Sequence, residues 1–413
     1  MSWKDSGGGL KKEYRSEEIF ITEKYPIFLN DERDMLIRRE HNNVGIITFH
    51  CADNFGAMLQ AYGLKKYLCN RGVNVCIVRY EPFFMIGRHW IIPYVPEGGL
   101  VGCLRTGIIL GKRRLSTGKF FTRKRANMRS FREKYLIKKS HRKLYFSSQL
   151  RKLTFRYYIV GSDQIWNPDI TFGLRSVYFG AFPNRRKEKV IAYGASLGGK
   201  ELPPEYDRKF FELIKYVDAV SLREEDAVSY VRKFYPGEVE TVLDPVFLLE
   251  KRYWMDIQKL PEQKKYILVY QTEYNQELVD YTKKLAKETG LPVLELQMEM
   301  WKNGRNFLEE YTAGPAEFLG YVYQAAYVVT NSFHAVAFSI IFEKDFLAFM
   351  HSSSGARIEN ILRISGLESR LYEQGKNEQI DFYIDWNEVH RKIKESLERS
   401  EEFLMKNLNM QEI

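Results

Sequence analysis

The sequence predicts an α/β protein built from two doubly wound domains. Short, β-branched apolar segments alternate with helix-length amphipathic segments along most of the chain, and polar residues follow the end of each apolar segment. The 413 residues exceed the size at which a single hydrophobic core keeps growing, which favours two domains. The composition, 45% hydrophobic and 28% charged, is typical of a folded globular chain and not of a disordered one.

The first domain is expected over residues 41–250. It opens with a right-handed βαβ unit, in which a strand at Val44–Phe49, a helix at Ala57–Asn70 and a strand at Val73–Tyr80 follow one another. The alternation pauses at residues 81–150 and then resumes. Further strands are predicted at Tyr157–Val160, Val190–Tyr193, Ala219–Leu222 and Val239–Leu243, and helices at Pro203–Tyr216 and Glu224–Phe234.

The second domain is expected over residues 262–371, after a charged interdomain crossing at Lys251–Lys265. Residues 1–40 show no firm period and are interpreted as an arm. Residues 372–413 contain an amphipathic helix that we expect to pack back across the domains. The strands predicted are Tyr266–Gln271, Pro292–Leu296, Tyr327–Thr330 and Phe346–Met350, and the helices are Gln276–Thr289, Pro315–Ala326, Arg357–Ser365 and Trp386–Leu404.

The insertion at residues 81–150 combines two compositions. Its first part is aromatic and apolar, and its second part is strongly basic: residues 112–156 hold 17 Lys and Arg against one acid, Glu133. The resulting charge of +16 leaves −6 for the rest of a chain whose net charge is +10. Two interpretations stay open, a solvated helical hairpin packed on the core or a docking site for an anionic surface such as a membrane leaflet.

The segment Tyr327–Phe342 carries the sharpest candidate site. A β-branched run is followed by Asn331, Ser332 and His334 and then by an apolar stretch of helical length, which predicts a strand, a turn and a helix. Such strand ends bind ligands because the first N–H groups of the next helix are unpaired. His334 either donates to an anion or transfers a proton near neutral pH, or it merely caps the helix.

Five strand-end segments, taken in order, resemble the polysaccharide pyruvyl transferase family. Each is short, but together they span most of the chain. They are Asp53–Tyr62, which is similar to the family's Asn-Tyr-Gly-Ala-x-Leu-Gln-Ala-Tyr element, Gly161–Asn167, which is similar to Gly-Ser-Asp-Gln-x-Trp, Ser221–Glu224, which is similar to Ser-x-Arg-Glu, and finally Leu243–Leu249 and Thr330–His334.

The resemblance implies both a fold and an activity. The fold would be similar to that of the GT-B glycosyltransferases, with two Rossmann-like domains facing a cleft. The activity would be transfer of the enolpyruvyl group of phosphoenolpyruvate to two hydroxyls of a sugar, which gives a cyclic pyruvate ketal on a surface glycan.

The chemistry of this donor suggests a role for each residue type. Phosphoenolpyruvate carries a carboxylate and a phosphate, and Arg223 is the arginine best placed to bind either group with two hydrogen bonds. His334 corresponds to the family's proposed general acid, which protonates the vinyl carbon. Asp163 and Asp244 are candidates for the base or for holding sugar hydroxyls, although carboxylates after strands are also common caps. The remaining substrate-binding candidates are Asp53, Asn54, Gly56, Ser162, Gln164, Asn331 and Ser332.

One position departs from the family pattern. Characterised members resemble an Arg-x-His arrangement, whereas here Ser332 stands two residues before His334. A hydroxyl can bond a phosphate but adds no charge. Either the basic insertion supplies the missing cation, for example through Arg123, Lys124 or Arg125, or this branch uses another donor.

Other functions use the same fold. A GT-B-type glycosyltransferase would take a nucleotide sugar in the cleft, and a non-catalytic relative would bind glycan without turnover. Nucleic-acid binding is not expected, because no known reading motif accompanies the basic run. The seven histidines show no metal-ligand spacing, so we expect no metal and no cofactor, with phosphoenolpyruvate as a co-substrate only.

The expected compartment is the cytoplasm. Cysteines 51, 69, 76 and 103 form no CxxC pair, residues 1–30 lack the apolar core of a signal peptide, and no apolar stretch reaches the about 20 residues of a membrane span. The expected partners are phosphoenolpyruvate, a sugar acceptor that is lipid-linked or part of a growing polysaccharide, and, through residues 112–156, the inner face of an anionic membrane.

Overall fold

The structure is a computed structural model that describes residues 43–86, 122–138, 140–182, 188–296, 307–351, 355–375 and 383–410. The predicted arm at residues 1–40 and the middle of the insertion, residues 87–121, lie outside the described residues. All the described residues belong to residues 37–413, which form one compact unit.

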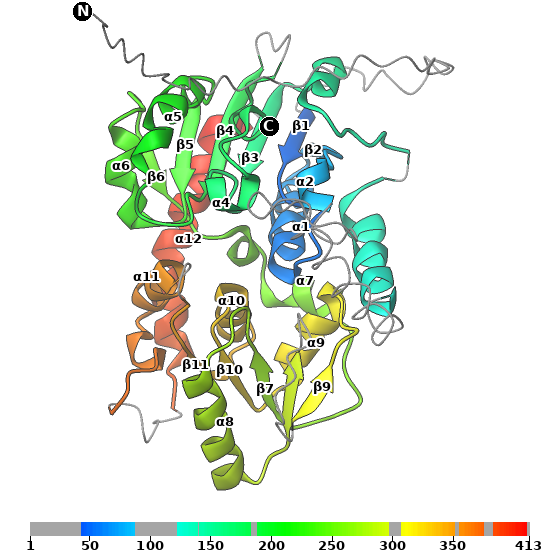
Figure 1. Ribbon diagram of the computed structural model, residues 1–413, viewed down its shortest axis with the longest axis vertical. Helices are drawn as coiled ribbons and strands as arrows, with labels where there is room; N and C mark the ends of the chain where they lie inside the picture. The colour runs from blue at the N-terminus through cyan, green and yellow to red at the C-terminus, as the bar shows by residue number, and fades with distance from the viewer. Residues whose placement is uncertain are drawn as a thin grey trace, which may run out of the picture. The chain divides into compact units, whose positions relative to one another are not determined.

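Two parallel sheets organise the chain (Figure 1). The first has six strands in the order β2-β1-β3-β4-β5-β6, and the second has five in the order β11-β10-β7-β8-β9. The strands of the first sheet are β1 (Asn43–Ile47), β2 (Asn74–Ile77), β3 (Tyr157–Gly161), β4 (Lys189–Ala195), β5 (Ala219–Leu222) and β6 (Val239–Thr241). Those of the second are β7 (Ile267–Tyr270), β8 (Val293–Leu296), β9 (Leu308–Glu310), β10 (Tyr327–Thr330) and β11 (Asp345–Ala348).

The strand orders confirm the predicted doubly wound α/β architecture. In each sheet the order reverses beside the first strand, between β1 and β3 and between β7 and β10. Parallel strands covered on both faces read as continuous apolar runs, and every residue of β3, β5, β7 and β8 is buried. Ligands of such sheets bind beyond the carboxyl ends of the strands, at the point where the order reverses.

Helices connect the strands and cover the sheets. The α-helices are α1 (Phe55–Asn70), α2 (Phe83–Ile86), α4 (Pro168–Thr171), α5 (Asp207–Ile214), α6 (Val228–Arg232), α7 (Lys251–Met255), α8 (Gln276–Thr289), α9 (Pro315–Gln324), α10 (Phe333–Ile341), α11 (Gly355–Ser365) and α12 (Trp386–Leu408). Residues 122–131 are also helical and continue into a short π-helical turn, η3 (Arg132–Leu136). The 3-10 turns are η4 (Ser147–Lys152), η5 (Ser176–Phe179), η6 (Pro204–Tyr206), η7 (Glu225–Ala227), η8 (Pro245–Leu248) and η9 (Glu368–Arg370).

Helix α1 lies between the two sheets, and its sequence explains why (Figure 1). Most of its residues are apolar and buried, so it has no solvent-facing stripe. Phe55 stacks on Phe318 of α9 with ring centroids 5.0 Å apart, and Tyr62 meets Trp254 of α7 edge-on at 5.5 Å. The amino end of α1 is thereby fixed against elements of the second sheet.

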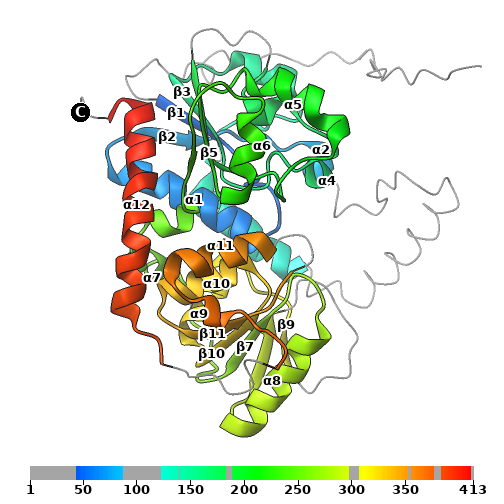
Figure 2. The ribbon, with the colours of Figure 1, turned by 90° about the vertical axis from the view of Figure 1, so that its left-hand side faces the viewer.

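Helix α12 runs past both sheets, as predicted for the C-terminal segment (Figure 2). Its second half bonds the first domain, where the Ser400 hydroxyl accepts the Leu243 N–H at 2.8 Å and Arg71 pairs with Glu401. Its first half packs on α11, and His390 lies 3.6 Å from Glu343 of the second domain. A single helix therefore joins the two halves of the fold.

The structure differs from the sequence predictions mainly in short elements. Strand β9 was not predicted, because its Leu-Glu-Glu sequence is largely exposed and has no apolar run. Helix α7 was not predicted either, because it lies in the charged crossing and buries only Trp254. Helix α5 is shorter than the predicted Pro203–Tyr216, since the chain begins there with a 3-10 turn.

Candidate functional site

Four predicted site residues from the two sheets meet at the carboxyl ends of their strands. Asp163 follows β3, Arg223 follows β5, Asp244 lies three residues beyond β6, and His334 is in the first turn of α10 after β10. Arg223, Asp244 and His334 lie close enough for ionic contact, and Asp163 reaches Arg223 from the open side. We call Asp163, Arg223, Asp244 and His334, with Arg357 described below, the ionic cluster.

Arg223 is the centre of the ionic cluster. Its side chain is only 3% exposed, its Nη1 donates to Asp244 Oδ2 at 2.5 Å, and its Nη2 lies 3.7 Å from Asp163 Oδ1. The second distance is too long for a hydrogen bond, so Nη2 and Nε have no hydrogen-bond partner among the described residues. Buried N–H groups left in this state are costly, and an anionic ligand would satisfy them.

Asp244 is fully enclosed and held from several sides. Its Oδ1 accepts the Val246 N–H and caps the turn η8, while Oδ2 faces Arg223 and His334. Burial alone would raise the pKa of the Asp244 carboxyl, but His334 and Arg223 together outweigh burial and lower it. Asp244 is therefore a carboxylate that orders its neighbours and is shielded from solvent.

His334 lies between Asp244 and the amino end of α1. Its Nε2 is buried, lies 3.7 Å from Asp244 Oδ2 and has no hydrogen-bond partner in the described structure. On the other side the ring packs against Gly56 so tightly that a Cβ there would lie 2.0 Å from Nδ1. Gly56 is thus required by close approach, and Asn54 fixes the same turn because its side chain accepts the Ala57 N–H at 3.0 Å.

Arg357 is a site residue that the sequence analysis did not single out. It lies on α11 with its side chain 11% exposed, 4.0 Å from Glu224, and its Nε has no partner among the described residues. Its guanidinium lies 5.7 Å from the centre of the Phe333 ring, and that of Arg223 lies 5.8 Å from the same ring. Burial and the neighbouring charge of Arg223 both lower the pKa of Arg357, so an anion between the two arginines would be stabilising.

A polar face of α11 explains how Arg357 reaches this position. Arg357, Asn360 and Arg363 are spaced three apart and therefore share one face of the helix. Asn360 donates to the Arg223 carbonyl at 3.0 Å, and Arg363 pairs with Glu225. This spacing is the signal that could have identified Arg357, but it does not reveal which segment the face contacts.

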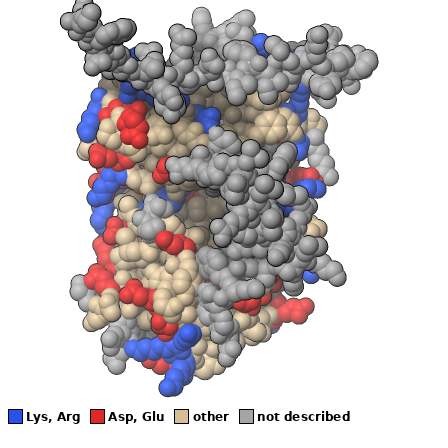
Figure 3. All heavy atoms as spheres, in the orientation of Figure 1, with Lys and Arg blue, Asp and Glu red and all other residues tan. Residues whose placement is uncertain are grey.

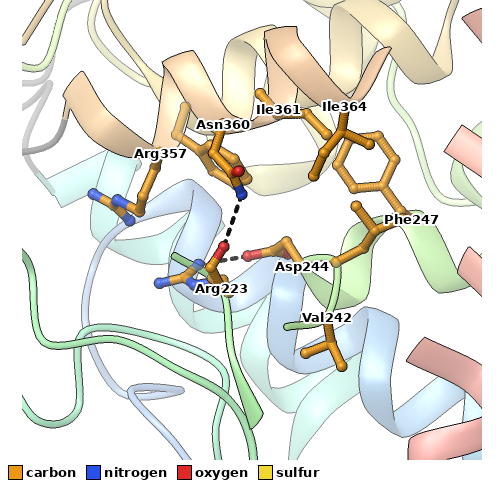
Figure 4. Close-up of a pocket in the computed structure, with 10 residues that line it drawn as sticks. Arg223, Val242, Asp244, Phe247, Arg357, Asn360, Ile361 and Ile364 are labelled. Carbon is orange, nitrogen blue, oxygen red and sulfur yellow. Dashed lines mark hydrogen bonds and ion pairs between the residues drawn. The ribbon is translucent and has the colours of Figure 1, made fainter. Parts of the chain in front are cut away.

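A pocket lies between this face of α11 and the segment that carries Asp244 (Figure 4). Arg223, Asp244, Arg357 and Asn360 form its polar wall. The rest of the lining is Leu243, Phe333 and the apolar side chains Val242, Phe247, Ile361 and Ile364. The guanidinium groups of Arg223 and Arg357 lie at one end of this pocket and point away from its apolar residues (Figure 4).

Several predicted site residues have side chains that bond the protein itself. Asp53 accepts from Arg132 at 2.8 Å, Ser162 donates to the Gly194 carbonyl, and Gln164 accepts from Asn167. The Asn331 amide accepts the Thr272 N–H at 2.9 Å and donates to the Glu273 carbonyl at 2.6 Å. Ser332 is the N-cap residue of α10, is 6% exposed and makes no capping bond with its side chain.

The cations suggested from the insertion are not in the pocket lining. Arg123 and Arg125 are exposed, and Lys124 is buried with its ammonium 5.7 Å from the centre of the Phe55 ring. Arg132, from the same basic run, donates to the carbonyls of His50 and Cys51 and to Asp53. In the part of the insertion that the structure describes, one basic side chain therefore clamps the loop after β1.

The described residues contain no group of three or more His, Cys, Asp or Glu side chains arranged to hold a metal ion. None of the described helices is long and apolar enough to cross a membrane.

Comparison with known proteins identifies the family. The family model described as polysaccharide pyruvyl transferase matches residues 54–353, a range that contains every member of the ionic cluster except Arg357. The chain belongs to the polysaccharide pyruvyl transferase family. Curated protein sequences gave no match.

Solved structures with a similar arrangement are distant in sequence. UDP-N-acetylglucosamine 2-epimerase from Rickettsia bellii has 11% identity and a TM-score of 0.43, with 90% of this chain and 98% of the other covered. The epimerase from Neisseria meningitidis bound to UDP-GlcNAc has 11% identity, coverages of 89% and 94% and a TM-score of 0.41. MnaA from S. aureus with UDP has 13% identity, coverages of 87% and 89% and a TM-score of 0.44.

The geometry of the ionic cluster defines what this family member can do chemically. Two buried arginines can hold an anion, since together they retain N–H groups without partners among the described residues. A histidine whose Nε2 lies 3.7 Å from a buried carboxylate is a residue type that can transfer a proton near neutral pH. Asp163, whose side chain is 14% exposed, is the carboxylate of the cluster that solvent or an acceptor can reach.

Proposed function

We propose that this protein is a phosphoenolpyruvate-dependent ketal pyruvyl transferase that acts on a sugar of a surface glycan. The observation that carries the proposal is the pair of buried arginines, Arg223 and Arg357, with unbonded N–H groups beside His334. A small dianion such as phosphoenolpyruvate matches this arrangement in charge, because each arginine can bind one anionic group.

Arg357 accounts for the departure at Ser332. The family pattern places an arginine at that position, and here the second cation would come from α11, next to the same Phe333 ring. The missing charge is then supplied from a different backbone position, and the donor need not change. A cation from Arg123, Lys124 or Arg125 would then not be needed for this role.

The reaction follows from these positions. His334 would donate a proton to the methylene carbon of phosphoenolpyruvate, which becomes a methyl group, while a first sugar hydroxyl adds to the neighbouring carbon. Asp244 would stabilise the charged ring before the transfer, and Asp163 would take the hydroxyl proton. The oxygen of a second hydroxyl of the same sugar then displaces the phosphate, its proton would return to His334, and the products are the cyclic ketal and inorganic phosphate.

The first experiment measures the melting temperature of the purified protein with phosphoenolpyruvate, inorganic phosphate or UDP. At 100 times the dissociation constant a ligand stabilises the folded state by about 2.7 kcal/mol, which gives a readily measured shift. A shift specific to phosphoenolpyruvate supports the proposal. A shift with UDP alone would contradict it and favour transfer from a nucleotide sugar.

The second experiment tests the chemical role of His334. His334→Ala should abolish release of phosphate from phosphoenolpyruvate in the presence of glycan acceptors, since it removes the proposed proton donor. Its melting temperature and its phosphoenolpyruvate shift should remain, because the arginines are intact. Full activity of this variant would exclude the proposed general acid.

A further inference from the structure

An exposed aromatic and basic surface lies beyond the carboxyl end of β2. Phe83 and Phe146 are 50% and 53% exposed, although Phe rings are usually buried. Tyr145 stacks on Phe83 with centroids 5.0 Å apart, and Phe146 meets Phe83 edge-on at 5.6 Å. The chain holds these rings together, because the Tyr80 and Leu144 segments pair in parallel.

The charges around these rings have one sign. Residues 134–162 contain eight Lys and Arg and no acid. Arg142, Lys143, Arg151 and Lys152 are exposed within six residues of Tyr145 or Phe146, and the nearby Glu81 is buried between Arg79 and Lys143. We call Phe83, Tyr145 and Phe146, together with Arg142, Arg151 and Lys152, the aromatic–basic patch.

The face that carries helix α8 mixes both signs. Helix α8 exposes Lys283 and Asp280 as a pair at 3.7 Å, and acids and bases intermingle over the face that carries it (Figure 3). Such mixing is the ordinary state of a solvated surface. The aromatic–basic patch lacks it, so its local field is positive and its centre is apolar.

We propose that the aromatic–basic patch docks the protein on an anionic lipid surface. Aromatic side chains insert at the boundary between headgroups and acyl chains, and adjacent cations bind anionic headgroups, so both properties of the patch are used at once. An acidic glycan would match the cations but would leave two half-exposed Phe rings without an apolar environment.

The position of the aromatic–basic patch relative to the ionic cluster suits an acceptor that is held at the membrane, and this step rests on the proposed function. β2 and β5 are separated by four strand spacings in the first sheet, so their carboxyl ends lie about 19 Å apart at the same edge. β5 leads into Arg223 and β2 leads towards Phe83. A short glycan carried by a membrane lipid could therefore span from the docked surface to the ionic cluster, which predicts a lipid-linked acceptor.

The test is flotation of the full-length protein with vesicles of phosphatidylcholine, alone or with about a third phosphatidylglycerol. We expect binding to the anionic vesicles only, and loss of most binding between about 0.1 and about 1 M salt. The double variant Phe83→Ser with Phe146→Ser should bind at least about ten-fold more weakly, because about half of each ring is available for insertion. Arg151→Glu with Lys152→Glu should weaken binding by more than about 25-fold, since each cation near the surface contributes about five-fold and the new carboxylates are repelled by the anionic lipid.

Two exposed aromatic side chains on and just after helix α5, outside the aromatic–basic patch, provide a matched control. Phe211 and Tyr216 are each 45% exposed, with Lys215 over the Phe211 ring, so Phe211→Ser with Tyr216→Ser removes equal aromatic area outside the patch. Equal losses from control and patch variants, or unchanged binding by the patch variants, would overturn the proposal. Binding to soluble alginate without binding to vesicles would overturn it in favour of a glycan.

The assay separates this proposal from the proposed function, because vesicle binding needs no phosphoenolpyruvate. Vesicle binding without a phosphoenolpyruvate shift would keep the docking surface and reject the donor. A melting shift with phosphoenolpyruvate but no vesicle binding would keep the donor and reject the docking surface. If both hold, the patch variants should retain full turnover of a soluble acceptor and lose turnover of a vesicle-bound one.

Discussion

The ionic cluster and the loops that follow the second sheet are built in opposite ways. In the ionic cluster, Arg223 of the first sheet keeps two buried N–H-bearing nitrogens without hydrogen-bond partners among the described residues, and Arg357 and His334, on helices that follow the second sheet, keep one nitrogen each. Beyond the second sheet, the polar side chains bond one another. Asn331 bonds the 272–273 segment with both ends of its amide, and Gln271 donates to Glu295 and accepts from Asn275.

This difference indicates that the ionic cluster can bind a ligand, whereas the loops after the second sheet support the site. Unpaired buried donors are costly unless a ligand satisfies them, and paired amides have little left to offer a ligand. The second sheet therefore contributes His334 and the Arg357 helix to the site, while the loops at its strand ends hold themselves rigid. Four predictions test this division, from the largest expected effect to the smallest.

Removing Arg223 should have the largest effect. Arg223→Ala leaves Asp244 buried without its partner, which typically destabilises a protein by about 3–5 kcal/mol, and it removes the proposed anion contact. Urea unfolding measures the first effect, and calorimetry with phosphoenolpyruvate measures the second. Since the single variant is at risk of unfolding, Arg223→Met with Asp244→Asn provides a variant without the unpaired charge, which should regain stability but not binding.

Arg363→Ala is the matched control for that change. Arg363 also pairs with an acid, Glu225, but both side chains are more than half exposed, and such pairs contribute at most about 1 kcal/mol. If the Arg363 variant loses as much stability as Arg223→Ala, burial is not what distinguishes the two arginines. If the Arg223 double variant binds phosphoenolpyruvate normally, the ionic cluster is not the donor site.

The sequence predicted the elements with clear periodicity and the residues at strand ends. Helix α8 matches its prediction at both ends because Asn275 caps its start and Gly290 adopts a left-handed conformation at its end. Asp163, Arg223, Asp244 and His334 were all chosen as strand-end residues, and the fold brings them together. Motif position was informative here because parallel strands all end at one edge of their sheet.

The sequence could not predict contacts made across the fold. Arg357 belongs to a helix of the second domain, and its position beside Arg223 depends on how α11 packs on the other domain. Asn331 is at a strand end and is a residue type that often contacts ligands, but its amide is already hydrogen-bonded to the 272–273 loop. Arg132 lies in a run interpreted as surface charge, yet it donates to two backbone carbonyls. Each case depends on a partner more than 50 residues away along the chain.

Buried His50, which follows β1 in the first domain, should make the stability of the protein depend on pH. Burial, as the main cause, lowers the pKa of His50 to about 4 from an ordinary value of 6.5, against a hydrogen bond to the Thr48 carbonyl that raises it. The unfolded chain therefore takes up a proton below about pH 6.5 that the folded chain takes up only near pH 4. Stability contributed by neutral His50 is complete above that window and falls by about 3 kcal/mol as the pH drops through it.

Urea unfolding at pH 7 and pH 4.5 measures this effect in the native protein and in His50→Gln. The native protein should lose more stability than the variant over this interval, since glutamine does not titrate. His390→Gln is a suitable control because His390 is a half-exposed histidine outside the first domain. Equal pH dependence of the native protein and His50→Gln would show that the buried ring is not the titrating group.

Gly56→Ala should reduce activity more than stability. The new methyl group would lie 2.0 Å from His334 Nδ1, so the ring must move, and a displacement of about 1 Å in a catalytic group can cost about 100-fold in rate. Steady-state release of phosphate from phosphoenolpyruvate gives the rate. Gly199→Ala is the matched control because the nearest atom would be 3.9 Å away, and it should retain activity. Equal rates for both alanine variants would mean that Gly56 does not position His334.

Asn331→Ala should have the smallest effect on phosphoenolpyruvate binding, because Asn331 belongs to the loops that support the site. It removes two hydrogen bonds to the partly exposed 272–273 segment, each of which typically contributes about 0.5–1.5 kcal/mol of stability. Phosphoenolpyruvate affinity should change little, since the ionic cluster is intact.

Asn360→Ala is the equivalent change beside Arg223, where it removes one hydrogen bond to the Arg223 carbonyl, and it should weaken binding more than it weakens the fold. Calorimetry and urea unfolding on both variants give the comparison. If Asn331→Ala abolishes binding while stability is unchanged, the carboxyl end of the second sheet is a ligand site after all, because only a lost ligand contact would separate the two measurements in that direction.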